Sequence, residues 1–167
     1  MRELLDELAA ATPAPGGGSA AAWAAALAAA LVEMAAGFAE DEDSRARAHE
    51  LRERALALAE EERGTYARVL DARRRGDERA AAEALSGAAD PPLAIARVAA
   101  EVAELGASVA RAGKEALKGD ALTGVELAEA ACRAAARLVE INLSDTPDDP
   151  RLAEAAELRR GTGAVRP

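Results

Sequence analysis

Apolar residues recur along most of this chain at intervals of three and four positions, the spacing that places them on one face of an α-helix. Short stretches rich in glycine, proline or acidic residues interrupt the pattern and separate one helix from the next. The pattern predicts helices over residues 2–10, 20–39, 45–75, 78–85, 91–112 and 120–143, and a last one from about residue 150. The helix over 20–39 is apolar almost all the way round, which is typical of the central helix of a bundle.

Composition favours the same fold class. Half of the 167 residues are apolar but only 2% are aromatic, so the core must be built mainly from Ala, Leu and Val. Alanine is the best helix former, and the residues that favour strands are scarce. We therefore expect an all-α protein, an antiparallel bundle of about six helices that forms a single domain over residues 1–167. Because small side chains bury little area per helix, we also expect a homodimer or a larger assembly.

Charge and cysteine content indicate which binding partners and which cellular compartment to expect. Lys and Arg number 21 against 30 Asp and Glu, a net charge of −9, so a nucleic acid is not an expected partner. The single cysteine, Cys132, cannot form a disulfide within the chain. Glu33 interrupts the alanine-rich stretch over 20–39, which favours a buried helix over a membrane span. The N-terminus has no signal-peptide pattern, so we expect a cytoplasmic protein without membrane association.

The segment TPAPGGGS over residues 12–19 is the most unusual part of the sequence. Two prolines and three consecutive glycines predict a tight loop in which Gly16, Gly17 and Gly18 adopt positive φ, approach a ligand closely, or do both. Ser19 is well placed to cap or enter the helix that follows. A second glycine, Gly76, follows three arginines and is predicted to end a helix in the left-handed conformation.

Few residues carry the usual signatures of chemistry. The lone histidine, His49, lies among charged residues and predicts a solvated side chain, and no metal site is expected. Glu62 extends the apolar stripe of its helix, so it must be ion-paired, hydrogen-bonded or functional. Glu33 is a similar case for which structural pairing is favoured. Asp120 follows Gly119 and is predicted to cap the last long helix, a position that also suits a functional carboxylate.

Two segments resemble the family of formiminotetrahydrofolate cyclodeaminases and methenyltetrahydrofolate cyclohydrolases. The first, TPAPGGGSAAAWAAALAAALVEMAAGF, is similar to that family's glycine loop and alanine-rich helix, and AGKEALKGDALTGVELAEAACRAAARLVEINL is similar to its later Asp-containing segment. Glu62, four residues before Tyr66, stands where an aspartate precedes a phenylalanine in that family. Lys114 and Gly119 depart from the asparagine and serine of its pattern.

The resemblance implies an all-helical folate enzyme, commonly dimeric, with a tetrahydrofolate derivative as its substrate and no further cofactor. Such an enzyme would convert 5-formiminotetrahydrofolate to 5,10-methenyltetrahydrofolate and release ammonia. The alternatives are a methenyltetrahydrofolate cyclohydrolase and a catalytically silent helical dimer that binds folate or a protein. The candidate catalytic residues are Asp120, as the acid/base, and Glu62, which assists it or holds the pterin ring. The candidate substrate-binding residues are Gly16, Gly17, Gly18, Ser19, Lys114, Lys118 and Asn142.

Overall fold

The computed structural model describes residues 1–162 and contains helices without strands over that range. The elements are α1 (Arg2–Ala9), α2 (Gly17–Phe38), α3 (Glu42–Arg74), α4 (Glu78–Gly87), α5 (Asp90–Ala112), a single 3-10 turn (Glu115–Leu117), α6 (Lys118–Asn142) and α7 (Pro150–Thr162). The predicted all-α class and antiparallel arrangement are confirmed. The predicted boundaries are within about three residues of those observed.

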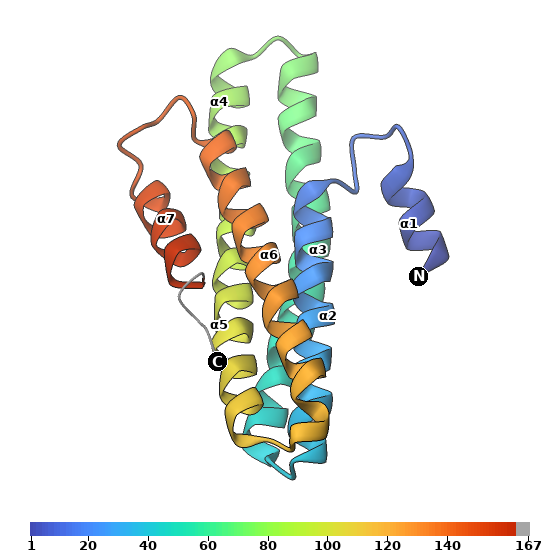
Figure 1. The fold of residues 1–167 in the computed structure, drawn as a ribbon. Coiled ribbons are helices and arrows are strands. Elements are labelled where there is room, and N and C mark those ends of the chain that lie inside the picture. The colour runs from blue at the N-terminus through green and yellow to red at the C-terminus, as the bar shows by residue number, and fades with distance from the viewer. Residues whose placement is uncertain (163–167) are drawn as a thin grey trace.

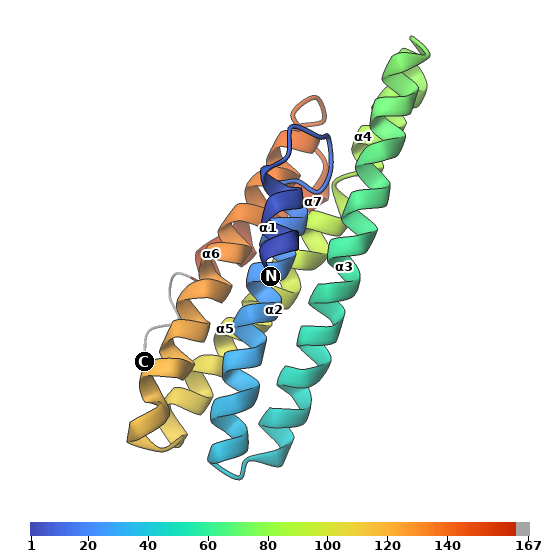
Figure 2. The same cartoon turned by 90° about the vertical axis from the view of Figure 1, so that its right-hand side faces the viewer.

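Four long helices, α2, α3, α5 and α6, run side by side in an antiparallel bundle (Figures 1 and 2), and α2 packs against the other three. The upper part of α3 and the helix that follows it, α4, extend beyond the end of α2. Helix α7 packs on the outside of α5 and α6. Helix α1 stands beside the bundle on the side of α2, joined to it by a loop that ends at Gly16.

Small residues let the central helices approach closely. A Cβ at Gly106 of α5 would lie 2.9 Å from Cγ2 of Val32 in α2, and a Cβ at Gly124 of α6 would lie 3.1 Å from the same atom. The Cβ at Gly124 would also lie 3.1 Å from the carbonyl oxygen of Ala28. Such distances are too short for ordinary packing, so the two glycines allow α5 and α6 to sit against α2 at this level.

Helix ends account for most differences from the sequence prediction. As predicted, Gly76 follows α3 with a φ of +68°. Helix α2 begins at Gly17 rather than near residue 20, with Gly16 as its N-cap. Helix α6 begins at Lys118, so the prediction that Asp120 caps it is wrong: Asp120 lies in the first turn. Helix α5 begins at Asp90, one residue before the predicted start, with Ala89 as its N-cap.

By length and composition alone, α2 is the one described helix that could cross a membrane. Half of its most apolar stretch is buried inside the protein, however, against α3, α5 and α6. A helix that is apolar nearly all round is also what the centre of a soluble bundle requires. The packing therefore accounts for its hydropathy.

Candidate functional site

A cavity of about 290 Å³ opens where the glycine loop enters α2. It brings together the N-terminal end of α2, the middle of α3, the start of α5 and the end of α6. Its lining comprises Pro13, Ala14, Gly16, Gly17, Gly18, Glu62, Pro92, Leu138, Ile141 and Asn142. We call this cavity the glycine-loop pocket. Five of the nine sequence-predicted site residues line it: the three glycines, Glu62 and Asn142.

The contact between Gly18 and Glu62 defines one wall of the pocket. A Cβ built on Gly18 would lie 2.4 Å from both Cδ and Oε1 of Glu62, and 2.6 Å from its Cγ. The Glu62 carboxyl group therefore occupies the place that any other residue at position 18 would need. Of the two reasons predicted for the glycines, close approach to a ligand stays a prediction, but Gly18 is closely approached. The group that approaches it here is a side chain of the protein itself.

The other reason, positive φ, is wrong for this loop. Gly76 is the one described glycine with a positive φ, and Gly16 has an extended backbone with a φ of −130°. Gly17 is exposed, and a Cβ there would meet Leu138 at 4.0 Å, an ordinary contact. The tight entry to α2 thus needs glycine at position 18 for space, while position 17 has room for a side chain.

Ser19 ties the carboxylate of Glu62 to the first turn of α2. Its buried hydroxyl lies 3.0 Å from Oε2 of Glu62 and 3.2 Å from the carbonyl oxygen of Ala59, so it donates to the α3 side of the site. The prediction that Ser19 enters the helix is confirmed, and its alternative role as a cap is not adopted. No side chain caps the N-terminus of α2, whose first amides therefore stay available at the pocket.

Glu62 is partly buried without a cation beside it. Within residues 1–162, no ion pair engages its carboxylate, whereas the neighbouring Glu61 pairs with Arg54 at 2.8 Å. Glu33, the other carboxylate on an apolar helix, is held 2.9 Å from Arg52 and 3.2 Å from His49. The structural pairing favoured for Glu33 is confirmed. Glu62 differs because its observed polar partner is a hydroxyl group.

Comparisons with known proteins identify the family of the chain. The family model of formiminotransferase-cyclodeaminase matches residues 1–160. The chain belongs to the formiminotransferase-cyclodeaminase family. The crystal structure of a formiminotetrahydrofolate cyclodeaminase from Thermotoga maritima is similar, with a TM-score of 0.87 and 27% sequence identity over 99% of this chain and 88% of that one. A search of curated proteins gives no match.

Asn142 closes the pocket at the end of α6. Its Nδ2 donates a hydrogen bond of 2.7 Å to the carbonyl oxygen of Ala88, at the junction of α4 and α5. Within the described residues no hydrogen bond engages its Oδ1 atom, so the amide oxygen remains free to accept one. In this member of the family, Asn142 therefore holds the pocket wall together through one end of its amide.

The remaining predicted residues of this family member lie at the opposite end of the bundle. Lys114 and Lys118 flank the 3-10 turn, and Asp120 lies in the first turn of α6. Asp120 and Asn142 are 22 residues apart on one helix, which at 1.5 Å per residue is about 33 Å. Over residues 1–162, no side-chain hydrogen bond or ion pair engages the carboxylate of Asp120, and Nζ of Lys118 lies 3.9 Å from Oε2 of Glu115. A single chain thus does not bring these three residues to the pocket.

Five residues that line the pocket were not among the predicted site residues: Pro13 and Ala14 of the loop, and Pro92, Leu138 and Ile141 of the helices. Ile141 is 56% exposed, an unusual state for a large apolar side chain that faces a cavity. The signal was present, because positions 138, 141 and 142 share one face of a helix. Pro92, Leu138 and Ile141 form an apolar wall. The opposite side presents the backbone of α2 and the carboxylate of Glu62 from α3. Among residues 1–162, no three His, Cys, Asp or Glu side chains are grouped to hold a metal ion.

Proposed function

We propose that this protein catalyses the cyclodeamination of 5-formiminotetrahydrofolate to 5,10-methenyltetrahydrofolate with release of ammonia. The observation that carries the proposal is the glycine-loop pocket, in which Glu62 lies against Gly18 beside the uncapped first turn of α2. Two findings support that reaction: the family to which the chain belongs, and its similarity to a solved structure named a formiminotetrahydrofolate cyclodeaminase. The tetrahydrofolate derivative is the substrate, and we propose no further cofactor.

The reaction needs a group that moves one proton between two nitrogens. N10 of the folate attacks the carbon of the protonated formimino group, –CH=NH2+, carried on N5, and a tetrahedral centre forms. The N10–H proton must leave and the departing nitrogen must gain one, after which the carbon–nitrogen bond to that group breaks and ammonia is released. A carboxylate within reach of both nitrogens provides this transfer, which typically accelerates a reaction by about 10²–10⁴-fold. Glu62 is the carboxylate that lines the pocket.

The first turn of α2 supplies the second element of the proposal. The free amides at a helix N-terminus bind anions and hydrogen-bond acceptors. Here they adjoin the pocket through Gly16, Gly17 and Gly18, where no Cβ separates backbone from ligand. The apolar wall from α5 and α6 suits a flat ring system, and Oδ1 of Asn142 suits an N–H donor of that ring. We propose that the pterin ring lies along this wall.

A homodimer would resolve the separation of the predicted residues. Large apolar side chains remain exposed along one face of α2, where Leu27 is 49% exposed and Phe38 58% exposed, and Leu56 of α3 extends that face. If two copies pair antiparallel through α2, a twofold axis places the α5–α6 turn of one copy at the pocket end of the other. We propose that Asp120, Lys114 and Lys118 serve the partner's pocket in this way, with Asp120 sharing the acid/base role and the lysines contacting the glutamate tail.

We further propose a cytoplasmic location, where reduced folates are used as one-carbon carriers. The negative net charge and the single buried cysteine suit that location. Helix α2 also suits it, because half of its most apolar stretch is buried inside the protein. The two candidate lysines would offset the repulsion between an acidic protein and an anionic glutamate tail.

The decisive experiment is to incubate the protein with 5-formiminotetrahydrofolate and to follow both the methenyl absorbance and ammonia release. The proposal predicts that both rise together in equal amounts. A parallel incubation with 5,10-methenyltetrahydrofolate tests the cyclohydrolase alternative, for which the methenyl absorbance would fall faster than without protein. Folate binding without turnover of either compound would instead support the catalytically silent dimer and would contradict the proposed reaction.

A further inference from the structure

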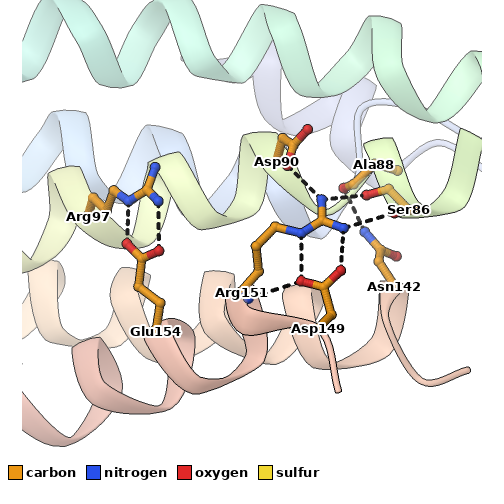
Figure 3. Close-up of polar contacts among 8 residues, drawn as sticks. All are labelled: Ser86, Ala88, Asp90, Arg97, Asn142, Asp149, Arg151 and Glu154. Atoms are coloured by element: carbon orange, nitrogen blue, oxygen red, sulfur yellow. Dashed lines mark hydrogen bonds and ion pairs between the residues drawn. The ribbon is translucent and has the colours of Figure 1, made fainter. Parts of the chain in front are cut away.

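The junction between α4 and α5, residues 86–90, is held by polar contacts from two other elements (Figure 3). Nδ2 of Asn142 donates to the carbonyl oxygen of Ala88. Arg151, in the first turn of α7, donates to the carbonyl oxygen of Ser86 at 2.9 Å and to its hydroxyl at 2.8 Å. Arg151 also donates to Oδ1 of Asp90 at 2.7 Å. Every second residue of the junction is therefore fixed by a side chain from α6 or α7.

The guanidinium of Arg151 has no N–H group left for another partner. Besides its three bonds to the junction, it donates to Asp149 through Nε at 3.0 Å and through Nη2 at 2.8 Å. A guanidinium carries five N–H donors, so all five are used. Asp149 in turn accepts from the backbone N–H of Arg151 at 3.0 Å, which fixes the carboxylate that orients the guanidinium. The planar fork is thus aimed at the junction from a rigid base.

The junction leads directly into the pocket. Pro92 follows Asp90 by two residues and lines the glycine-loop pocket, as does Asn142. Both therefore depend on the same short segment: Pro92 through the chain and Asn142 through its bond to Ala88. Nothing places Arg151 itself in the pocket lining, so any effect on the ligand must pass through this segment.

We propose that Arg151 is a positioning residue of the glycine-loop pocket: by fixing residues 86–90 it sets the places of Pro92 and Asn142 against the folate ring. The proposal rests on the proposed function for the identity of the ligand. The mechanical role of Arg151 is independent of the proposed function, because the contacts that define that role lie within the protein. Small displacements of a binding wall lower affinity and rate strongly.

The chain offers a matched control in a second arginine that also contacts α7. Arg97 of α5 forms a two-pronged ion pair with Glu154 of α7, with bonds of 2.5 Å and 2.8 Å. This pair also joins α7 to α5, yet it touches neither the junction nor the pocket lining. Loss of either arginine removes hydrogen bonds that hold α7 against the rest of the bundle. Only the loss of Arg151 releases residues 86–90.

The test compares the wild type with Arg151→Gln, Arg151→Lys and Arg97→Gln. We expect faster hydrogen exchange in residues 84–93 of Arg151→Gln and unchanged exchange there in Arg97→Gln. In the cyclodeamination assay we expect the KM of Arg151→Gln to rise by about tenfold or more, with kcat changed less, while Arg97→Gln keeps the wild-type KM. Arg151→Lys, which keeps the charge and three donors, should recover part of the loss.

The two proposals fail in different ways. Equal exchange at residues 84–93 in all variants, or an equal rise of KM in Arg97→Gln, would overturn the positioning role of Arg151. If the wild type neither binds nor converts folates, the proposed function is wrong, and hydrogen exchange still decides whether Arg151 holds the junction. If Arg151→Gln does not fold, Arg151→Lys provides the same comparison.

Discussion

The two ends of the bundle hold the two halves of the sequence-predicted site, and they are built differently. At the pocket end, Ser19 is buried, Gly18 has no space for a Cβ, and Glu62 is fixed against both. At the other end, Lys114 is exposed and the carboxylate of Asp120 has no hydrogen-bond partner within residues 1–162. Contacts within one chain therefore prepare the first half of the site. The second half lies away from the pocket of its own chain, and in the proposed homodimer it would serve the pocket of the partner.

This difference suggests where each kind of change will act. Substitutions at the pocket end alter geometry that one chain already determines, so their effects should not depend on protein concentration. Substitutions at the turn end should act through the assembly. The following predictions test that division.

Glu62→Gln should have the largest effect at the pocket end. The amide keeps an oxygen that can accept from Ser19 but cannot carry a proton, so kcat should fall by about 10²–10⁴-fold. Since no cation pairs with Glu62 among the described residues, no buried partner is left behind and the Tm should change little. Steady-state kinetics and thermal unfolding on the same sample check both parts. A rise of KM with normal kcat would assign Glu62 to holding the pterin instead.

Asp120→Asn should lower activity by about 10²-fold or less. Whether Asp120 acts in the pocket of the partner subunit can be measured directly. Mixing Asp120→Asn with Glu62→Gln subunits yields mixed dimers in which one of the two sites has both native residues. After unfolding and refolding an equal mixture, activity should recover to about a quarter of the wild type, because half the dimers are mixed. No recovery, or a monomer by light scattering, would contradict a site shared between copies.

Gly18→Ala and Gly17→Ala form a pair of neighbouring substitutions with different predicted results. The new Cβ at position 18 must push aside the Glu62 carboxyl group, which is the flexible end of a side chain, so activity should fall by about tenfold with a small loss of stability. At position 17 the Cβ reaches only Leu138, at 4.0 Å, so Glu62 is not displaced and the loss of activity should be smaller than at position 18. Equal effects of the two changes would count against the Gly18–Glu62 contact as a determinant of the site.

The smallest expected effect concerns acid stability. Hydrogen bonds from Arg151 lower the pKa of Asp149 from 3.8 to about 2. A carboxyl group with a lowered pKa in the folded state stabilises the fold above its unfolded pKa and loses that contribution as the pH falls through the folded value. The difference in Tm between the wild type and Asp149→Asn should thus shrink as the pH is lowered from about 5 to 2. A difference that stays constant over this range would show that the ion pair does not contribute.

Most of the fold could be predicted because a helix is indicated by the pattern of residues within its own short segment of sequence. The three-and-four spacing located each helix, and the single left-handed glycine after α3 was expected at Gly76. The start of α2 was predicted three residues late because consecutive glycines are poor helix formers. Here Gly18 belongs to the first turn because only a residue without Cβ leaves room for Glu62, and that is a tertiary reason.

The candidate site was less predictable for the same reason. Glu62 was identified from its own helix, as a carboxylate on an apolar stripe, and Asn142 from the family resemblance. The sequence did not show that these two share a pocket while Asp120, on the same helix as Asn142, lies about 33 Å away. Pro92 and Leu138 look like ordinary core residues in the sequence. Only the packing of α5 and α6 shows that they line a cavity.

The contact of Val32 with Gly106 and Gly124 has a consequence for how this sequence can diverge. The three residues come from three different helices, and each glycine lacks room for even one more carbon atom. A larger residue at position 106 or 124 is therefore tolerated only if position 32 becomes smaller. A residue larger than valine at position 32 is not tolerated, because glycine at 106 and 124 cannot become smaller. Across related sequences these positions should covary, with their summed volume nearly constant, while the surface of the bundle changes freely.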